Sequence, residues 1–369
     1  MQFIDLKTQQ EKIKAGINAR IQTVLAHGKY IMGPEIKEFE QVLVDFVKVK
    51  HCIACSSGTD ALLMALMAWD IGPGDVVFTP PFTFIATAEV IQLLGATPVF
   101  VEIDENTFNI NPAKLDEEID RIKKEGKLTP KIIIPVDLFG LPANYPEIDS
   151  ISRKYDLLVL EDGAQGFGGS IEGKMACSFG NMAATSFFPA KPLGCYGDGG
   201  AIFTHEDSLA EKLVSIRVHG KGGHKYDNVR VGINGRFDTL QAAILLEKMT
   251  IFPEEIRLRN AVAAQYTERL KNKVITPFIP DGYVSAWAQY SIVAESADHR
   301  TEIQERLKNH DIPTAIYYPI PLHLQTAFTK LGYRKGDFPV SESTSERILS
   351  LPMHPYLTES DIEKITSLV

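Results

Sequence analysis

At residues 51–62 the chain reads His51-Cys52-Ile53-Ala54-Cys55-Ser56-Ser57-Gly58-Thr59-Asp60-Ala61-Leu62. The first five residues have the composition of a buried strand, and two serines and a glycine then indicate a turn. From residue 59 to 69 apolar residues recur at helical spacing, which predicts a helix that begins directly after the turn. A strand that passes through a short turn into a helix is typical of an α/β fold.

The same alternation of strand and helix continues to about residue 205. Strands are predicted at 51–55, 76–79, 97–103, 131–137, 157–161, 183–188 and 200–204. Helices are predicted at 59–69, 86–94 and, as a charged surface helix, 116–124. This pattern predicts a mostly parallel, seven-stranded sheet flanked by helices, with ligands bound beyond the carboxyl ends of the strands.

The remainder of the chain has a different pattern, which predicts a second domain. Helices are expected at 239–249, 254–271 and 301–309 and from Ser360 onward, with a strand-like run at 286–293 and a Pro-rich stretch at 317–322. We expect a large domain over 1–250 and a smaller α+β domain over 251–369. The N-terminal helix at 11–26 is a candidate to pack on the smaller domain.

Composition excludes several classes of function. With 369 residues and a formal net charge of −9, the chain lacks the excess of Lys and Arg that a sequence-independent grip on nucleic acid requires. It has no leader-like N-terminus and no long apolar run, so we expect a cytoplasmic protein that does not enter a membrane. Four cysteines, of which only Cys52 and Cys55 are close in sequence, predict buried packing residues and no metal site.

Three segments could carry chemistry, and each has a plainer interpretation. The turn at Ser57, Gly58 and Thr59 opens a helix, so its N–H groups could hold a phosphate, although an ordinary helix cap has the same composition. Asp162 ends an apolar strand before Gly163, where a carboxylate could face a ligand's basic nitrogen or could simply cap a helix.

The third segment is the loop of Lys191, which has apolar, Pro and Gly neighbours and Ser186 five residues before it. Poor hydration lowers the pKa of an amine and frees it to form an imine, although most lysines are simply solvated. The combination is more specific than its parts. An amine, a strand-end carboxylate and a phosphate-binding turn are what pyridoxal 5′-phosphate requires.

At this point the sequence resembles the sugar aminotransferases of the DegT/DnrJ/EryC1/StrS family, which have fold type I of the pyridoxal-phosphate enzymes. The resemblance covers nearly the whole chain and is most specific in the block from Ser186 to Gly200. It also includes residues 3–6, 57–62, 81–87, 161–165 and 351–355. One departure is Gly163, where many relatives have Ala, and it leaves the spacing from Asp162 to Gln165 intact.

The resemblance implies a role for each matching residue. Lys191 would carry the cofactor and move the proton. Asp162 would pair with the ring nitrogen, Gln165 would meet the ring hydroxyl, and Phe84 would stack on the ring. The phosphate would lie against Gly58, Thr59 and Ser186. Asn234 would reach the phosphate of a neighbouring subunit, which makes a homodimer with shared active sites part of the expectation.

The resemblance also indicates a substrate. The chain is most similar to the branch that uses glutamate to aminate C3 of UDP-2-acetamido-2-deoxy-3-keto-hexuronic acids for bacterial surface polysaccharide such as O-antigen. A basic stretch could face the nucleotide or be a solvated loop; it contains Arg217, His219, Lys221, His224, Lys225, Arg230 and Arg236. Arg236 is the candidate partner of the sugar carboxylate, and Tyr317, Tyr318 and His323 are candidate sugar contacts, although the Tyr-Tyr-Pro run could merely pack a domain junction.

Other functions stay open. A 4-aminotransferase on a UDP- or dTDP-4-keto-deoxysugar would use the same cofactor residues. A non-catalytic sugar-nucleotide sensor would keep the fold without turnover. A dehydratase of this fold has His where this chain has Lys191, and a nicotinamide dehydrogenase would need a Gly-x-Gly-x-x-Gly run after an early strand, which is missing.

Overall fold

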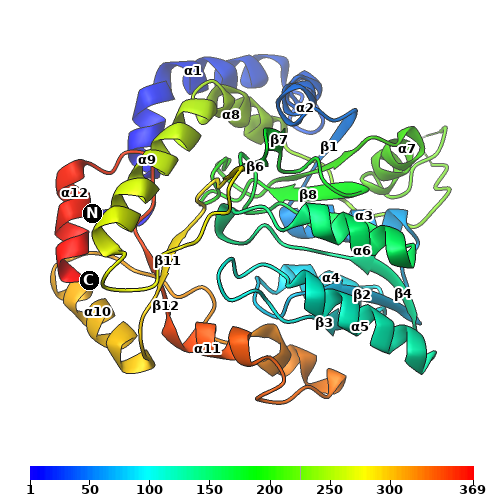
Figure 1. The fold of residues 1–369 in the computed structure, drawn as a ribbon. Coiled ribbons are helices and arrows are strands. Elements are labelled where there is room, and N and C mark those ends of the chain that lie inside the picture. The colour runs from blue at the N-terminus through cyan, green and yellow to red at the C-terminus, as the bar shows by residue number, and fades with distance from the viewer. Residues whose placement is uncertain (225) are drawn as a thin grey trace.

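A seven-stranded sheet forms the centre of the chain in a computed structural model that describes residues 1–224 and 226–369 (Figure 1). The strand order is β1-β9-β8-β5-β4-β2-β3. Strand β9 runs antiparallel to both of its neighbours, and the pairs from β8 to β3 are parallel. The strands are β1 (His51–Cys55), β2 (Asp75–Thr79), β3 (Thr97–Phe100), β4 (Thr129–Ile133), β5 (Leu158–Asp162), β8 (Met182–Ser186) and β9 (Gly200–Thr204). The prediction of a mostly parallel, seven-stranded sheet is confirmed.

Both faces of the sheet are buried because side chains alternate along each strand. Ile53 and Cys55 belong to a core with α3 (Gly58–Ala68), α4 (Ala86–Leu93) and α7 (Asp207–Ile216). Cys52 and Ala54 face the other way, into a core with α2 (Pro34–Val47) and α8 (Thr239–Met249). The same face continues under α5 (Pro112–Glu125) and α6 (Tyr145–Tyr155). All four cysteines are buried and free, as expected.

The elements after α8 lie beside the sheet (Figure 1). They are α9 (Phe252–Leu270), β10 (Tyr283–Val284), β11 (Tyr290–Val293), α10 (Ala297–Asn309), α11 (Pro339–Arg347), β12 (Ile348–Leu351) and α12 (Glu359–Leu368). Among them, α9, β11, α10, β12 and α12 share a core of their own. Strand β11 pairs antiparallel with β12. Strand β10 joins β6 (Ser170–Ile171) and β7 (Lys174–Met175) in a small separate sheet. The boundary at residue 250 stays a prediction.

Helix α1 (Leu6–His27) packs chiefly on α8, which belongs to the predicted large domain. Ile13 and Ile17 form a buried cluster with Ile244 of α8. Near the start of α1, the Nε2 of Gln9 lies 2.8 Å from Oε2 of Glu255 on α9, and the amine of Lys12 lies 4.4 Å from the centre of the Tyr356 ring. The apolar stripe of α1 therefore packs on α8, and the start of the helix also contacts the chain after residue 250.

Among the described residues, no helix is both long and apolar enough to cross a membrane.

Candidate active site

A cavity of about 430 Å³ lies at the carboxyl ends of the parallel strands, where the fold places ligands. It brings together residues that are far apart in the sequence and that the sequence analysis singled out. These are Gly58, Thr59, Phe84, Asp162, Gln165, Ser186, Lys191, Tyr317 and Tyr318. The first seven are predicted cofactor residues, and the two tyrosines are predicted substrate residues.

The turn into α3 forms one end of this cavity. Ser57 caps the helix, since its hydroxyl accepts from the N–H of Asp60 at 3.0 Å. This serine is therefore an ordinary helix cap. The next N–H groups, at Gly58 and Thr59, have no partner within the helix because they are in its first turn. A Cβ on Gly58 would lie 2.6 Å from the Cβ of Ser186, so the turn and the end of β8 touch. Together they form a compact cradle for an anion.

Asp162 is buried at the end of β5 and faces the cavity. Its Oδ2 accepts from the hydroxyl of Thr87 at 2.8 Å, and its Oδ1 accepts from the N–H of Ala164 at 3.2 Å. Among the described residues, no Lys or Arg lies within ion-pair distance of this carboxylate. Burial raises its pKa, while the two hydrogen bonds and the charge of Lys191 act in the opposite direction. A buried carboxylate without a cation is costly, so this site fits a ligand that brings a cationic nitrogen.

Lys191 is the second titratable group of the cavity. Desolvation lowers the pKa of its amine, and the neighbouring Asp162 only partly opposes that shift. A lowered pKa increases the fraction of neutral amine near pH 7, which is the form that attacks an aldehyde. The position and the electrostatics of Lys191 therefore match the role predicted for it.

Gln165 is held by two neighbours. Its Oε1 accepts from the N–H of Phe139 at 2.8 Å, and its Nε2 donates to the hydroxyl of Tyr318 at 3.2 Å. The hydroxyl of Tyr318 can still donate, so one polar group of the cavity comes from the C-terminal part of the chain. Phe84 lines the same cavity with 54% of its surface exposed, which leaves an aromatic face free for a planar ring.

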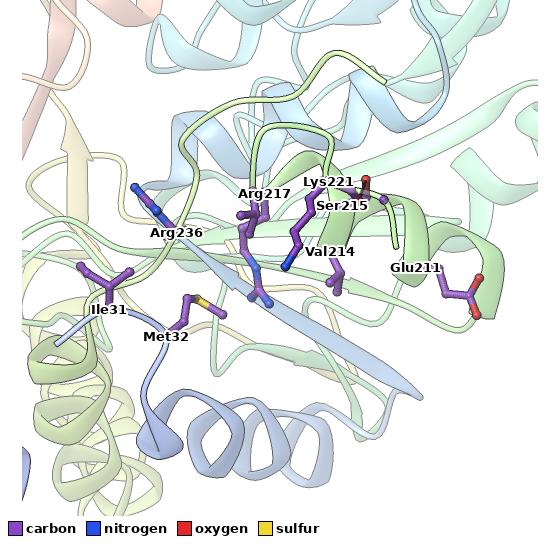
Figure 2. Close-up of a pocket in the computed structure, with 10 residues that line it drawn as sticks. Ile31, Met32, Glu211, Val214, Ser215, Arg217, Lys221 and Arg236 are labelled. Atoms are coloured by element: carbon purple, nitrogen blue, oxygen red, sulfur yellow. Dashed lines mark hydrogen bonds between the residues drawn. The ribbon is translucent and has the colours of Figure 1, made fainter. Parts of the chain in front are cut away.

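Asn234 and Arg236 do not line the cavity of Lys191. They line an adjoining cavity of about 340 Å³, which shares Asp198 with the first. Arg236 also lines a cavity of about 680 Å³ with Ile31, Arg217 and Lys221 (Figure 2). The Nε of Arg236 donates to Oδ1 of Asn234 at 2.8 Å, so the two side chains form one polar unit in a cavity beside the one that contains Lys191.

The basic stretch is not a single ligand-facing surface. Arg217 is buried, and its guanidinium donates to Glu40 and to the carbonyl of Ala54, both at 2.7 Å. The guanidinium of Arg217 therefore has partners in the interior of its own chain. Lys221 and Arg236 line the cavity of Figure 2, whereas Lys225 lies outside the described residues.

The prediction that His323 contacts the sugar is wrong. Its side chain is fully buried, with Nε2 3.0 Å from Oε1 of Glu342, and its ring packs on Phe338. His323 lines none of the cavities that contain Lys191 or Arg236. The imidazole of His323 is instead hydrogen-bonded to Glu342 on α11, a helix that the sequence analysis did not predict.

Thr87 is a site residue that the sequence analysis did not single out. It fixes Asp162 and is in turn 3.3 Å from the hydroxyl of Thr83, with both threonines lining the cavity. The signal was present, because Thr87 lies in the quoted segment 81–87, three residues after Phe84. Asp198, within the block from Ser186 to Gly200, and Gln289, which is outside every segment quoted for the resemblance, also line the cavity.

The site thus combines a lysine of lowered pKa, a buried carboxylate that needs a cation, an anion cradle and an exposed aromatic face. This combination defines the class of pyridoxal-phosphate enzymes, and the residues present fit that cofactor. Comparison with known proteins gives the family. Residues 11–369 match the DegT/DnrJ/EryC1/StrS aminotransferase family, and the chain belongs to it.

Individual relatives are similar over their full length. UDP-2-acetamido-2-deoxy-3-oxo-D-glucuronate aminotransferase of Pseudomonas aeruginosa is 50% identical over 99% of this chain and 98% of its own. UDP-N-acetyl-3-dehydro-alpha-D-glucosamine 3-aminotransferase of Acidithiobacillus ferrooxidans is 37% identical over 100% and 96%. A DegT/DnrJ/EryC1/StrS aminotransferase from Brucella abortus has a crystal structure with a TM-score of 0.97, 52% identity and coverage of 100% and 98%. The expectation of a fold-type-I, pyridoxal-phosphate-dependent aminotransferase is confirmed by this membership.

Proposed function

We propose that this enzyme transfers an amino group from glutamate to C3 of UDP-2-acetamido-2-deoxy-3-keto-hexuronic acid. The observation that carries the catalytic part is the convergence of Lys191, Asp162 and the α3 turn on one cavity. The substrate is supported by the similarity to the 3-oxo-glucuronate aminotransferase, and C3 by the names of two further relatives that act at a 3-position. The product would serve bacterial surface polysaccharide such as O-antigen.

When bound, pyridoxal 5′-phosphate supplies an aldehyde that accepts the amino group and a ring that delocalises charge. Gly58, Thr59 and Ser186 would hold its phosphate, Phe84 would lie on the ring, and Gln165 would meet the ring hydroxyl. Asp162 would keep the ring nitrogen protonated, because a cation against this carboxylate relieves the cost of its burial.

Lys191 has two functions in this proposal. Its neutral Nζ would bind the cofactor. Once released, the same amine would move a proton between the substrate carbon and C4′ of the cofactor. A base works best when its pKa lies near the working pH, and desolvation moves the pKa of Lys191 in that direction. The same burial that frees the amine for the cofactor thus suits it to proton transfer.

A homodimer completes the site in this proposal. Asn234 and Arg236 line a cavity that adjoins the Lys191 cavity, and neither residue lines the Lys191 cavity of its own chain, which suits a loop that serves a neighbouring subunit. Asn234 would contact the neighbour's phosphate. Arg236 would pair with the C6 carboxylate of the neighbour's sugar, because its planar fork matches a carboxylate. Tyr317 and Tyr318 would contact the sugar from the subunit's own chain.

The substrate assignment can be tested by exchanging Arg236 for Lys, which keeps the charge, and for Met, which loses it. Loss of a hydrogen bond to a charged group costs about 1.5–3 kcal/mol, so kcat/KM for the keto-uronate should fall roughly ten- to a hundredfold in Arg236→Met. Arg257→Met is the matched control, because Arg257 is an exposed arginine paired with Glu254 on α9. The glutamate half-reaction is measured separately by single turnover.

Two alternatives remain as outcomes of that test. A wild-type enzyme that prefers a neutral 4-keto sugar nucleotide over the uronate would replace the proposal with a 4-aminotransferase. A protein that binds the sugar nucleotide but shows no half-reaction with any amino donor would be a sensor.

A further inference from the structure

Helix α8 carries a buried lysine, Lys248, whose role the site description does not use. The residue is 1% exposed. Its Nζ donates to the carbonyl of Gly194 at 2.6 Å and lies 4.5 Å from the centre of the Tyr196 ring. Both contacts are on the loop that carries Lys191.

Burial of the ammonium group of Lys248 has a desolvation cost. Burial lowers the pKa of Lys248 to about 8, with Glu255 and Cys195 opposing the shift at a distance. Among the described residues, no carboxylate lies within ion-pair distance of its Nζ. An apolar residue would fill the same space without a desolvation cost, so the contact with Gly194 is what distinguishes lysine here.

The loop transmits that contact toward Lys191. Gly194 follows Lys191 by three residues, and a Cβ on it would lie 2.4 Å from the carbonyl oxygen of Pro189. The two ends of the loop are thus pressed together around Lys191. The N–H of Lys191 donates to Phe188 at 2.9 Å and that of Cys195 to Phe187 at 2.8 Å, which closes the turn.

The same helix holds the loop at a second point. Gln241 lies seven residues before Lys248, which places both side chains on one face of α8. Its Oε1 accepts from the N–H of Tyr196 at 2.8 Å. Two polar side chains of α8, Gln241 and Lys248, therefore form hydrogen bonds with the loop from 187 to 197.

We propose that Lys248 is a positioning residue that holds the Lys191 loop through the carbonyl of Gly194. This inference rests on the proposed role of Lys191 as the residue that binds the cofactor. It predicts that loss of the ammonium leaves the sheet and the cofactor cradle in place but lets the turn around Lys191 open.

The test is amide hydrogen exchange on the cofactor-free dimer, with the wild type and Lys248→Met. The N–H groups of Lys191, Cys195 and Tyr196 should exchange roughly ten- to a hundredfold faster in the variant, while those of β9 stay unchanged. Lys212→Met is the control, since Lys212 pairs with Asp70 on the surface side of α7. Gln241→Leu removes the second of these hydrogen bonds without burying or deleting a charge and should loosen the same loop, should Lys248→Met fail to fold.

Kinetics give a second readout. In the loaded enzyme, the single-turnover rate constant with glutamate should fall about tenfold or more in Lys248→Met, while the concentration of glutamate for half-maximal rate stays within about twofold, because binding groups are untouched. Unchanged exchange in the loop of both variants, or acceleration spread evenly over the whole chain, overturns the inference.

Reductive trapping separates this inference from the proposed function. Borohydride reduction of the loaded wild type followed by peptide mapping should place the cofactor on Lys191. A cofactor found on another lysine overturns both claims. A cofactor on Lys191 together with an undisturbed loop in the variants overturns the positioning role alone.

Discussion

Gly58→Ala should weaken cofactor binding without unfolding the protein. The added Cβ would lie 2.6 Å from the Cβ of Ser186, 3.1 Å from its Oγ and 3.2 Å from its Cα. These atoms belong to the end of a central strand, so the turn cannot gain space by rotating a flexible side chain. The turn and Ser186 must therefore separate, and they are the two halves of the proposed phosphate cradle.

The expected size follows from the geometry. Inserting a methyl group into a packed contact costs about 1–3 kcal/mol, and each 1.4 kcal/mol changes a dissociation constant about tenfold. The Kd for pyridoxal 5′-phosphate should thus rise roughly ten- to a hundredfold. The cofactor-free protein should lose less stability, because Ala favours the first turn of α3 more than Gly does, by up to about 1 kcal/mol.

The assay is a titration of cofactor-free protein followed by absorbance, with thermal unfolding of the same samples. Gly72→Ala is the matched control, since the nearest atom to its added Cβ would be the carbonyl oxygen of Leu94 at 3.9 Å. An unchanged Kd in Gly58→Ala would show that this turn does not hold the phosphate.

Three further predictions concern the charges and the assembly of the site. Asp162→Asn should keep the cofactor but slow both half-reactions at least a hundredfold in single turnover, since an amide does not hold the ring nitrogen protonated; near-normal rates would remove Asp162 from that role. Mixing Lys191→Ala and Asn234→Ala chains should restore activity by forming heterodimers with one intact site, whereas an inactive mixture with proven subunit exchange would exclude shared sites. Burial raises the pKa of Asp137 to about 7 beside Glu161, so the folded chain keeps a proton that the unfolded chain has lost. Denaturant unfolding should therefore show stability falling by up to about 1.4 kcal/mol per pH unit from about pH 4 to 7, and a wild-type slope no steeper than that of Asp137→Asn would contradict this.

The limits of a helix or strand could be predicted from the sequence where its apolar pattern is regular and turn-forming residues flank it. Strand β1 and helix α8 have the predicted limits, and α3 begins one residue early because Gly58 already belongs to the helix. The strand predicted at 131–137 ends at Ile133. Pro135 has no N–H for the ladder, although its carbonyl still accepts from Asp162 at 2.9 Å.

Helices α2, α6, α7 and α11 were not predicted. Three of them begin with Pro in the first turn, at Pro34, Pro146 and Pro339, which is a sequence signal for the start of a helix. One of these helices, α11, decides where the side chain of His323 lies. The contact between His323 and Glu342 depends on the position of α11, so the sequence does not show that the imidazole has a partner within the fold.

The meeting of the α3 turn, Asp162 and the Lys191 loop could be expected from the sequence, because the parallel sheet brings the carboxyl ends of its strands to one edge. Phe84, Gln165 and Asn234 are expected only from the resemblance to the family. The roles of residues that act through another side chain cannot be predicted in this way. Thr87 acts on Asp162 and Lys248 on the loop of Lys191, and each depends on a contact between segments far apart in the chain.

The most direct test of the central claim is to load the enzyme with pyridoxamine 5′-phosphate and mix it with a panel of keto-sugar nucleotides. The account predicts that UDP-2-acetamido-2-deoxy-3-keto-glucuronic acid restores the visible absorbance of the lysine-bound cofactor in one rapid phase, and that Lys191→Ala abolishes this change. Restoration by a 4-keto sugar but not by the 3-keto-uronate would contradict the substrate, and no change with any keto sugar would contradict the amino transfer itself.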